Sequence, residues 1–168
     1  MSLFLLLLVV SAFSQSATKN PWVDWDFLIG NWPSVQGGGV PGQANAGSFS
    51  VLPDMGGQVL VQKGHSEYPA ANGRPAVIHD DLMIIYPEAG MTKAVYFDNE
   101  GHVIHYDVGF SPDKKKVVFL SEKAAGAPQF RLTYEGLQPG TLKIVFEIAP
   151  PNNPEQFSKY VEGTVHKK

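Results

Sequence analysis

The feature that most constrains this chain is a series of short extended segments separated by still shorter turns. From residue 48 onward, apolar and polar residues alternate with a period of two, and turn-forming residues recur about every eight to twelve residues. The turns are too short for a parallel crossover, which needs about a dozen residues, so neighbouring strands are expected to be antiparallel. This pattern predicts strands at 48–52, 58–68, 76–86, 92–98, 102–110, 116–122, 129–135, 141–148 and 156–166.

Such a meander leaves two unpaired sheet edges unless it closes on itself. We therefore expect an all-β fold, an antiparallel up-and-down barrel of about 8–10 strands, because closure removes both edges. Residues 25–32, with the sequence WDFLIGNW, are the clearest helical candidate, since Pro21 suits a helix start and Gly30 suits a helix end. This short N-terminal helix, rich in aromatic residues, is predicted to plug one end of the barrel.

The first residues predict a signal peptide that is not part of the fold. Residues 3–10 are almost entirely aliphatic and are followed by small polar residues, a pattern typical of a secretory leader and too short to span a bilayer. Cleavage fits before Gln15 or after Ser16. We expect residues 1–16 to be the signal peptide and residues 17–168 to be a single β-barrel domain. The mature protein is then periplasmic or secreted, with no membrane span after signal removal.

Composition narrows the range of partners. The chain has 13 Lys and Arg against 16 Asp and Glu, which gives a net charge of −3. Proteins that bind nucleic acid usually have a basic face, so no nucleic-acid partner is predicted. The absence of cysteine excludes disulfides and lipid attachment at a lipobox. The Gly-rich run at 37–39 lacks the Gly-Lys-Ser/Thr ending of a phosphate-binding loop and is predicted to belong to a long loop over 33–48. No haem, flavin or nucleotide motif is present, so no cofactor is predicted.

Three motifs resemble those of a known protein family. Residues 26–32 (DFLIGNW) resemble the opening Phe-Leu-x-Gly-x-Trp motif of lipocalin-like bacterial calycins. Residues 55–62 (MGGQVLVQ) resemble the Gly-Gly-x-x-Leu strand of that family, and residues 96–101 (YFDNEG) resemble its Tyr-Phe-Asp-x-x-Gly hairpin. Order and spacing match over most of residues 24–110, and the C-terminal third fits in its strand rhythm alone. The resemblance implies an exported, calycin-like barrel in a family without a settled function. Pro33 stands where that family usually has Gly and charged residues, so the barrel entrance is expected to differ.

Histidines beside carboxylates are the candidates for chemistry. Side chains two apart on a strand share a face, and this spacing gives three pairs: His65 with Glu67, His79 with Asp81, and His105 with Asp107. Each pair fits an oriented catalytic base, two ligands of a metal ion, or a solvent-facing polar surface. No complete metal motif occurs, so no metal site is predicted. Residues 64–68 begin like a nucleophile elbow, but Tyr68 stands where the elbow needs a closing Gly.

Aromatic residues at alternating positions are the candidates for lining a cavity. Small barrels hold ligands with aliphatic and aromatic walls and a few polar anchors. Several strands here are apolar on both faces, so the sequence leaves open which face points inward. The predicted ligand-binding residues are Trp32 near the closed end, Tyr96, Tyr106, Phe130 and Tyr134 as cavity lining, and His65 and His105 as polar groups.

Three functions fit these observations. The first is an exported barrel that binds a small, partly apolar molecule. The second is a small hydrolase or isomerase that uses a His–carboxylate pair inside the same cavity. The third is a structural role, in which the barrel is packed solid with side chains. The oligomeric state is left open by the sequence.

Overall fold

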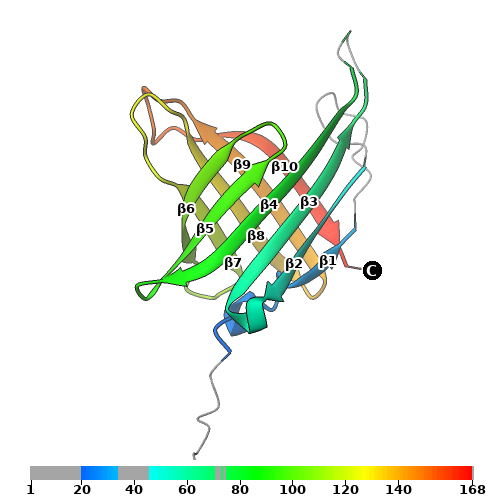
Figure 1. Ribbon diagram of the computed structural model, residues 1–168, viewed down its shortest axis with the longest axis vertical. Coiled ribbons are helices and arrows are strands. Elements are labelled where there is room, and N and C mark those ends of the chain that lie inside the picture. Colours follow the sequence, from blue (N-terminus) through cyan, green and yellow to red (C-terminus); the bar gives the residue numbers. More distant parts are fainter. Residues whose placement is uncertain (1–19, 34–45, 71–72, 74, 168) are drawn as a thin grey trace, which may run out of the picture.

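The chain forms one ten-stranded antiparallel sheet that curls into a nearly closed barrel (Figure 1). The computed structural model describes residues 20–33, 46–70, 73 and 75–167, so the predicted leader and most of the predicted loop over 33–48 lie outside the described residues. Strand order in the sheet follows strand order in the sequence, which is up-and-down connectivity. The strands are β1 (Gly30–Trp32), β2 (Ala46–Asp54), β3 (Val59–Tyr68), β4 (Val77–Glu88), β5 (Met91–Asp98), β6 (Val103–Phe110), β7 (Lys116–Ser121), β8 (Gln129–Gln138), β9 (Thr141–Ala149) and β10 (Ser158–His166).

The predicted strands are confirmed, and only their ends differ by a few residues. The predicted helix over 25–32 is wrong in its extent. Only a 3-10 turn, η1 (Val23–Trp25), is helical in this segment. Gly30–Trp32 form β1, a strand in addition to the nine that were predicted. Gly30 has a φ of 137°, a left-handed value that side-chain-bearing residues rarely adopt. The glycine that suggested a helix end is therefore the point at which the chain turns into the sheet. A second 3-10 turn, η2 (Met55–Gly57), joins β2 to β3.

Cross-strand register settles which faces point inward. Ile85 on β4 pairs with Leu60 on β3 and with Ala94 on β5, and all three side chains are buried. Their neighbours two residues along each strand share the same face. Register extends this inward face around the barrel to Tyr106, Phe119 and Tyr134, which are also buried.

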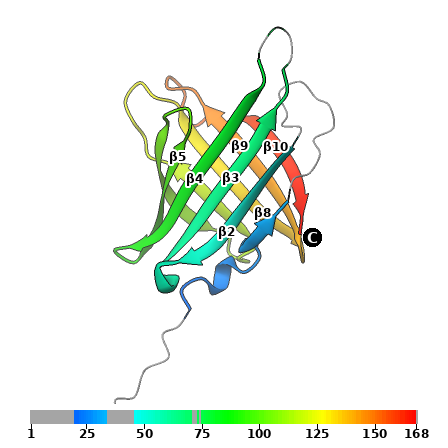
Figure 2. The ribbon, with the colours of Figure 1, turned by 45° about the vertical axis from the view of Figure 1, so that its right-hand side comes forward.

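One end of the barrel is closed by the segment around η1, as predicted (Figures 1 and 2). The Trp25 ring packs edge-on against Phe110 at a centroid distance of 5.1 Å and against Phe119 at 6.0 Å. The Trp22 indole donates a hydrogen bond to the Gly57 carbonyl of η2 at 2.8 Å. These contacts join the η1 segment to β6, β7 and η2, so aromatic packing and a hydrogen bond hold it at this end of the barrel.

The sheet has two edges, β1 and β10, which meet at a seam without forming a ladder among the described residues. The Lys167 ammonium bridges this seam by donating to the Ile29 carbonyl at 2.6 Å and lying 4.7 Å from the centroid of the Trp32 ring. The Lys167 backbone N–H also donates to the Gly140 carbonyl at 2.8 Å. None of the helices in the described ranges is long and apolar enough to cross a membrane.

Candidate functional site

The barrel interior differs between its two ends. Near η1 many inward side chains are fully buried, among them Leu60, Ile85 and Phe119 at 0% exposure, although Val108 and Phe110 are half-buried. At the opposite end, which we call the mouth, inward side chains are only half-buried, and these are Tyr96 on β5, Ile104 on β6, Phe130 and Leu132 on β8, and Phe146 and Ile148 on β9. The inward side chains at the mouth thus keep part of their surface accessible to solvent. We call this end the open half of the barrel and the end near η1 the packed half.

Polar side chains meet where the packed half gives way to the open half. Tyr134 donates from its hydroxyl to Gln62 Oε1 at 2.9 Å, and Gln62 Nε2 donates to Asp81 Oδ1 at 3.4 Å. Tyr134 and Gln62 are buried, at 3% and 5% exposure, and Asp81 is half-buried above them. We call Gln62, His79, Asp81, Tyr96 and Tyr134 the interior cluster. It forms the polar floor of the open half.

A glycine on the neighbouring strand makes room for the Asp81 side chain. Gly64 on β3 pairs directly with Asp81 on β4. A β-carbon on Gly64 would lie 2.6 Å from Asp81 Cγ and closer still to Oδ2, so the carboxyl group occupies the space that a side chain would fill. Glycine inside a strand often marks such a close approach. Here it fixes the carboxyl against the barrel wall, facing the interior.

Asp81 and Asp98 are cross-strand partners with different surroundings. Asp98 accepts hydrogen bonds from the backbone N–H groups of Glu100 and His102 at 3.0 and 2.9 Å, and its Oδ2 lies 2.8 Å from His102 Nδ1. Burial alone would raise the pKa of Asp98, but these bonds hold it below its usual value. Burial raises the pKa of Asp81, and the single bond from Gln62 only partly offsets this. Asp98 is thus committed to the β5–β6 turn, whereas Asp81 makes no ion pair with any residue in the described ranges.

His79 connects the cluster to the rim of the mouth. Its Nδ1 lies 2.9 Å from Glu100 Oε1, and its Nε2 lies 2.9 Å from the Tyr96 hydroxyl. Tyr96 pairs with Met83, so its ring must lean along β4 past Asp81 to reach His79. Burial, followed by the charge of Asp81, raises the pKa of Tyr96, so its phenol remains protonated at physiological pH.

The structure divides the predicted ligand-binding residues into three groups. Tyr96 and Phe130 point into the open half of the barrel, and Tyr106 and Tyr134 lie buried at its floor. Trp32 lies in the packed half, 1% exposed, with its indole donating to the Leu28 carbonyl at 2.8 Å. His65 and His105 lie on the outer face of the barrel, because their strand neighbours Gly64 and Tyr106 point inward. Sequence reasoning missed Gln62, and it weighed Asp81 only as a partner of His79.

Of the three predicted His–carboxylate pairs, one makes a direct contact. His65 Nε2 lies 3.3 Å from Glu67 Oε1, and its Nδ1 lies 2.6 Å from Asp80 Oδ1, which raises the pKa of His65. His79 shares the inward face with Asp81 but bonds to Glu100 and Tyr96. Asp107, on the outer face beside His105, pairs with Lys93 at 2.5 Å. Among the described residues, no group of three or more His, Cys, Asp or Glu is arranged to hold a metal ion.

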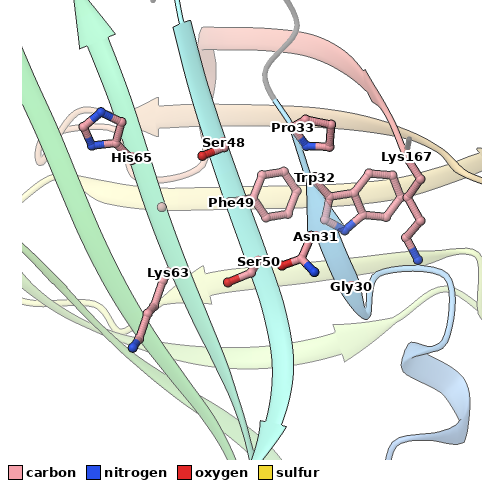
Figure 3. A pocket seen from close by; sticks show the side chains of 11 residues that line it. Gly30, Asn31, Trp32, Pro33, Ser48, Phe49, Ser50, Lys63, His65 and Lys167 are labelled. Atoms are coloured by element: carbon pink, nitrogen blue, oxygen red, sulfur yellow. The ribbon is translucent and has the colours of Figure 1, made fainter.

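A groove of about 710 Å³ lies on the barrel surface near the seam, along β1, β2 and β3 (Figure 3). Phe49 points from β2 toward Trp32, and the two rings stack with centroids 6.0 Å apart. The Ser48 and Ser50 hydroxyls point to the other side of the strand. The cationic groups in this groove are largely engaged, since His65 contacts two carboxylates and Lys167 binds the Ile29 carbonyl. The interior cluster, with an unpaired carboxyl and a partly exposed apolar wall, is the stronger candidate site.

Comparison with known proteins finds neither a family model that matches this sequence nor a curated protein with significant similarity to it.

Proposed function

We propose that this protein binds a small, partly apolar molecule inside the open half of its barrel. The observation that carries the proposal is the combination of a polar floor, the interior cluster, with an accessible apolar wall formed by Ile104, Phe130, Leu132 and Phe146. Binding sites for small molecules have this composition: mostly apolar walls with a few polar groups that fix orientation. A barrel with a purely structural role would be packed along its whole length.

Export belongs to the same proposal. The aliphatic residues 3–10 and the small residues after them support it, and a periplasmic or secreted barrel would meet its ligand outside the cytoplasm. Membership in the lipocalin-like calycins is likewise supported by the three sequence motifs and by the antiparallel up-and-down sheet.

Binding is favoured over catalysis by the chemistry of the cluster. Glu100, His79 and Tyr96 form a carboxylate–imidazole–hydroxyl chain that resembles an activated nucleophile in its connectivity. An activated nucleophile needs a lowered pKa or a base that removes its proton, whereas burial raises the pKa of Tyr96. The raised pKa of Tyr96 disfavours loss of its proton and so favours a hydrogen-bonding phenol over a nucleophile.

Interior binding can be tested with a pair of substitutions at adjacent positions of β6. Ile104 points inward, whereas Val103 points outward and is 56% exposed. We expect Ile104→Trp to fill the open half and to weaken binding of the uncharged apolar dye N-phenyl-1-naphthylamine at least about tenfold, or 1.4 kcal/mol. Val103→Trp adds the same ring to the outer face and should leave the affinity within about twofold. Fluorescence titration measures both affinities, and circular dichroism checks that both variants fold.

Equal affinity of the two variants for the dye would place binding outside the barrel and contradict the proposal. If Ile104→Trp does not fold, Leu132→Phe provides a smaller obstruction at another inward position of the mouth. We expect it to weaken dye binding in the same direction.

A further inference from the structure

We propose that the ligand is an organic cation, an amine whose ammonium group contacts Asp81 while its apolar body lies against the inward side chains of the mouth. This inference rests on the proposed function and specifies the chemical class of the ligand. It is carried by the distribution of charge across the two faces of the sheet.

Lysine and arginine side chains are absent from the inward face of the described strands, and the His79 imidazole on that face is bound to Glu100 and Tyr96. Register places Lys63, Lys93, Lys116, Arg131, Lys143 and Lys159 on the outer face. Several of them pair there with acidic residues, as Arg131 does with Glu147 at 2.6 Å and Lys93 with Asp107 at 2.5 Å. A ligand in the open half therefore meets no ammonium or guanidinium group from these strands. A carboxylate or phosphate ligand would find no lysine or arginine partner on these strands and would face Asp81.

Asp81 is the inward carboxyl that keeps capacity for a ligand. Asp98 accepts from two backbone N–H groups and contacts the His102 imidazole, which leaves little capacity for another donor. Asp81 accepts one long bond, 3.4 Å, from the Gln62 amide. Its other close neighbour on β3 is Gly64, which has no side chain to offer it a donor. A carboxylate can accept several hydrogen bonds, so the free capacity of Asp81 matches the multiple donors of an ammonium group.

The rings around the open half suit the same ligand. The aromatic side chains Tyr96 and Phe130 are inward and half-buried, and Phe130 stacks on Phe146 at a centroid distance of 5.9 Å. Aromatic faces attract cations, and they also cover the alkyl or aryl body of an amine. The Tyr96 hydroxyl already lies 2.9 Å from His79, which holds its ring beside Asp81. A carboxylate flanked by aromatic rings is a general means of binding ammonium groups.

Three probes with one alkyl chain and different head groups test the inference: octylammonium, 1-octanol and octanoate, titrated calorimetrically at pH 8 into the full chain. We expect octylammonium to bind at least about tenfold more tightly than 1-octanol, since a hydrogen-bonded charge contributes about 1.5–3 kcal/mol, and octanoate to bind most weakly. Asp81→Asn should abolish the preference for octylammonium over 1-octanol, whatever its effect on the affinity for 1-octanol itself. The control is Asp80→Asn, the same change one residue away on the outer face, which should retain the preference.

A second variant displaces the Asp81 carboxyl group without changing Asp81 itself. Gly64→Ala places a β-carbon where the carboxyl group lies, so Asp81 must move, and the preference for octylammonium should fall while 1-octanol still binds. Octylammonium binding that equals 1-octanol binding, or a preference that survives Asp81→Asn, would overturn the inference. If none of the three probes binds but the apolar dye does, the amine inference fails and the binding function stands. If the dye fails as well, the proposed function fails with it.

Discussion

Burial raises the pKa of the Asp81 carboxyl in the folded protein above its ordinary value, and this has a consequence for stability. A carboxyl whose pKa is higher when folded than when unfolded favours the unfolded state once it ionises. The effect is absent at a pH below the unfolded pKa of about 4, grows as pH rises through the folded pKa, and is constant above it. A residue that destabilises the fold at neutral pH is more typical of a binding site than of a structural core.

We therefore expect Asp81→Asn to raise the thermal midpoint at pH 7 and to lose this advantage as the pH falls toward 3. Urea or thermal unfolding of both proteins across that pH range measures the difference. The substitution leaves unchanged the groups that interact with Asp81, which are Gln62, Tyr68, His79, Asp80, Tyr96, Asp98, Tyr106 and Tyr134. A variant that is less stable than the wild type at pH 7 would mean that Asp81 is a structural hydrogen-bonding group.

The sequence could not single out Asp81 because both faces of β4 carry apolar side chains. Met83 and Ile85 share the face of Asp81, but Leu82 and Ile84 share the face of Asp80. Ile78 also points outward and is 55% exposed, although it is apolar. Alternation therefore shows that a strand exists without showing its inward face. Register across ten strands resolves the ambiguity, and register depends on contacts between distant residues.

At the scale of elements, turn chemistry predicted nine strands because each lies between Gly-, Pro-, Asn- or Asp-rich connections. β1 was missed because it has only three residues, too few to show alternation, and because its Gly30 also suits a helix end. The aromatic residues before it were correctly predicted to close one end of the barrel. This prediction rested on the number of aromatic residues in the segment, and a helical period was not needed for it.

The closing segment gives a prediction of its own. Trp25 in η1 is 2% exposed and contacts Phe110 and Phe119, whereas Val23 in the same turn is 54% exposed. We expect Trp25→Ala to lower the free energy of unfolding by about 3–5 kcal/mol, the range for a large buried aromatic side chain. Val23→Ala should change it by less than about 0.5 kcal/mol. Urea denaturation of the two variants measures both values, and a small loss for Trp25→Ala would show that the barrel end is stable without its plug.

At the scale of the whole molecule, an up-and-down barrel closes only if its first and last strands are held together. β1 pairs with β2 and β10 pairs with β9, and among the described residues no ladder joins β1 to β10. The seam is bridged by Lys167, whose ammonium donates to the Ile29 carbonyl at 2.6 Å and lies over the Trp32 ring. Gly30 has no side chain where the Lys167 stem passes, since a β-carbon there would lie 2.9 Å from Lys167 Cε. In the part of the chain that the structure describes, a long side chain thus bridges the seam, where a fully paired barrel would use a row of backbone bonds.

This closure predicts a local response to Lys167→Met, which keeps an unbranched stem and removes the ammonium. The hydrogen bond is solvent-exposed, so we expect a loss of about 1 kcal/mol in the free energy of unfolding. Hydrogen exchange should reveal the position of the effect: amides of β1 and β10 become less protected, while those of β4 to β8 keep their protection. Lys115→Met, which removes an exposed lysine from the β6–β7 turn, should leave both regions unchanged. Equal loss of protection in all strands would mean that the seam unfolds only with the whole barrel, and that Lys167 contributes to global stability without closing a separable edge.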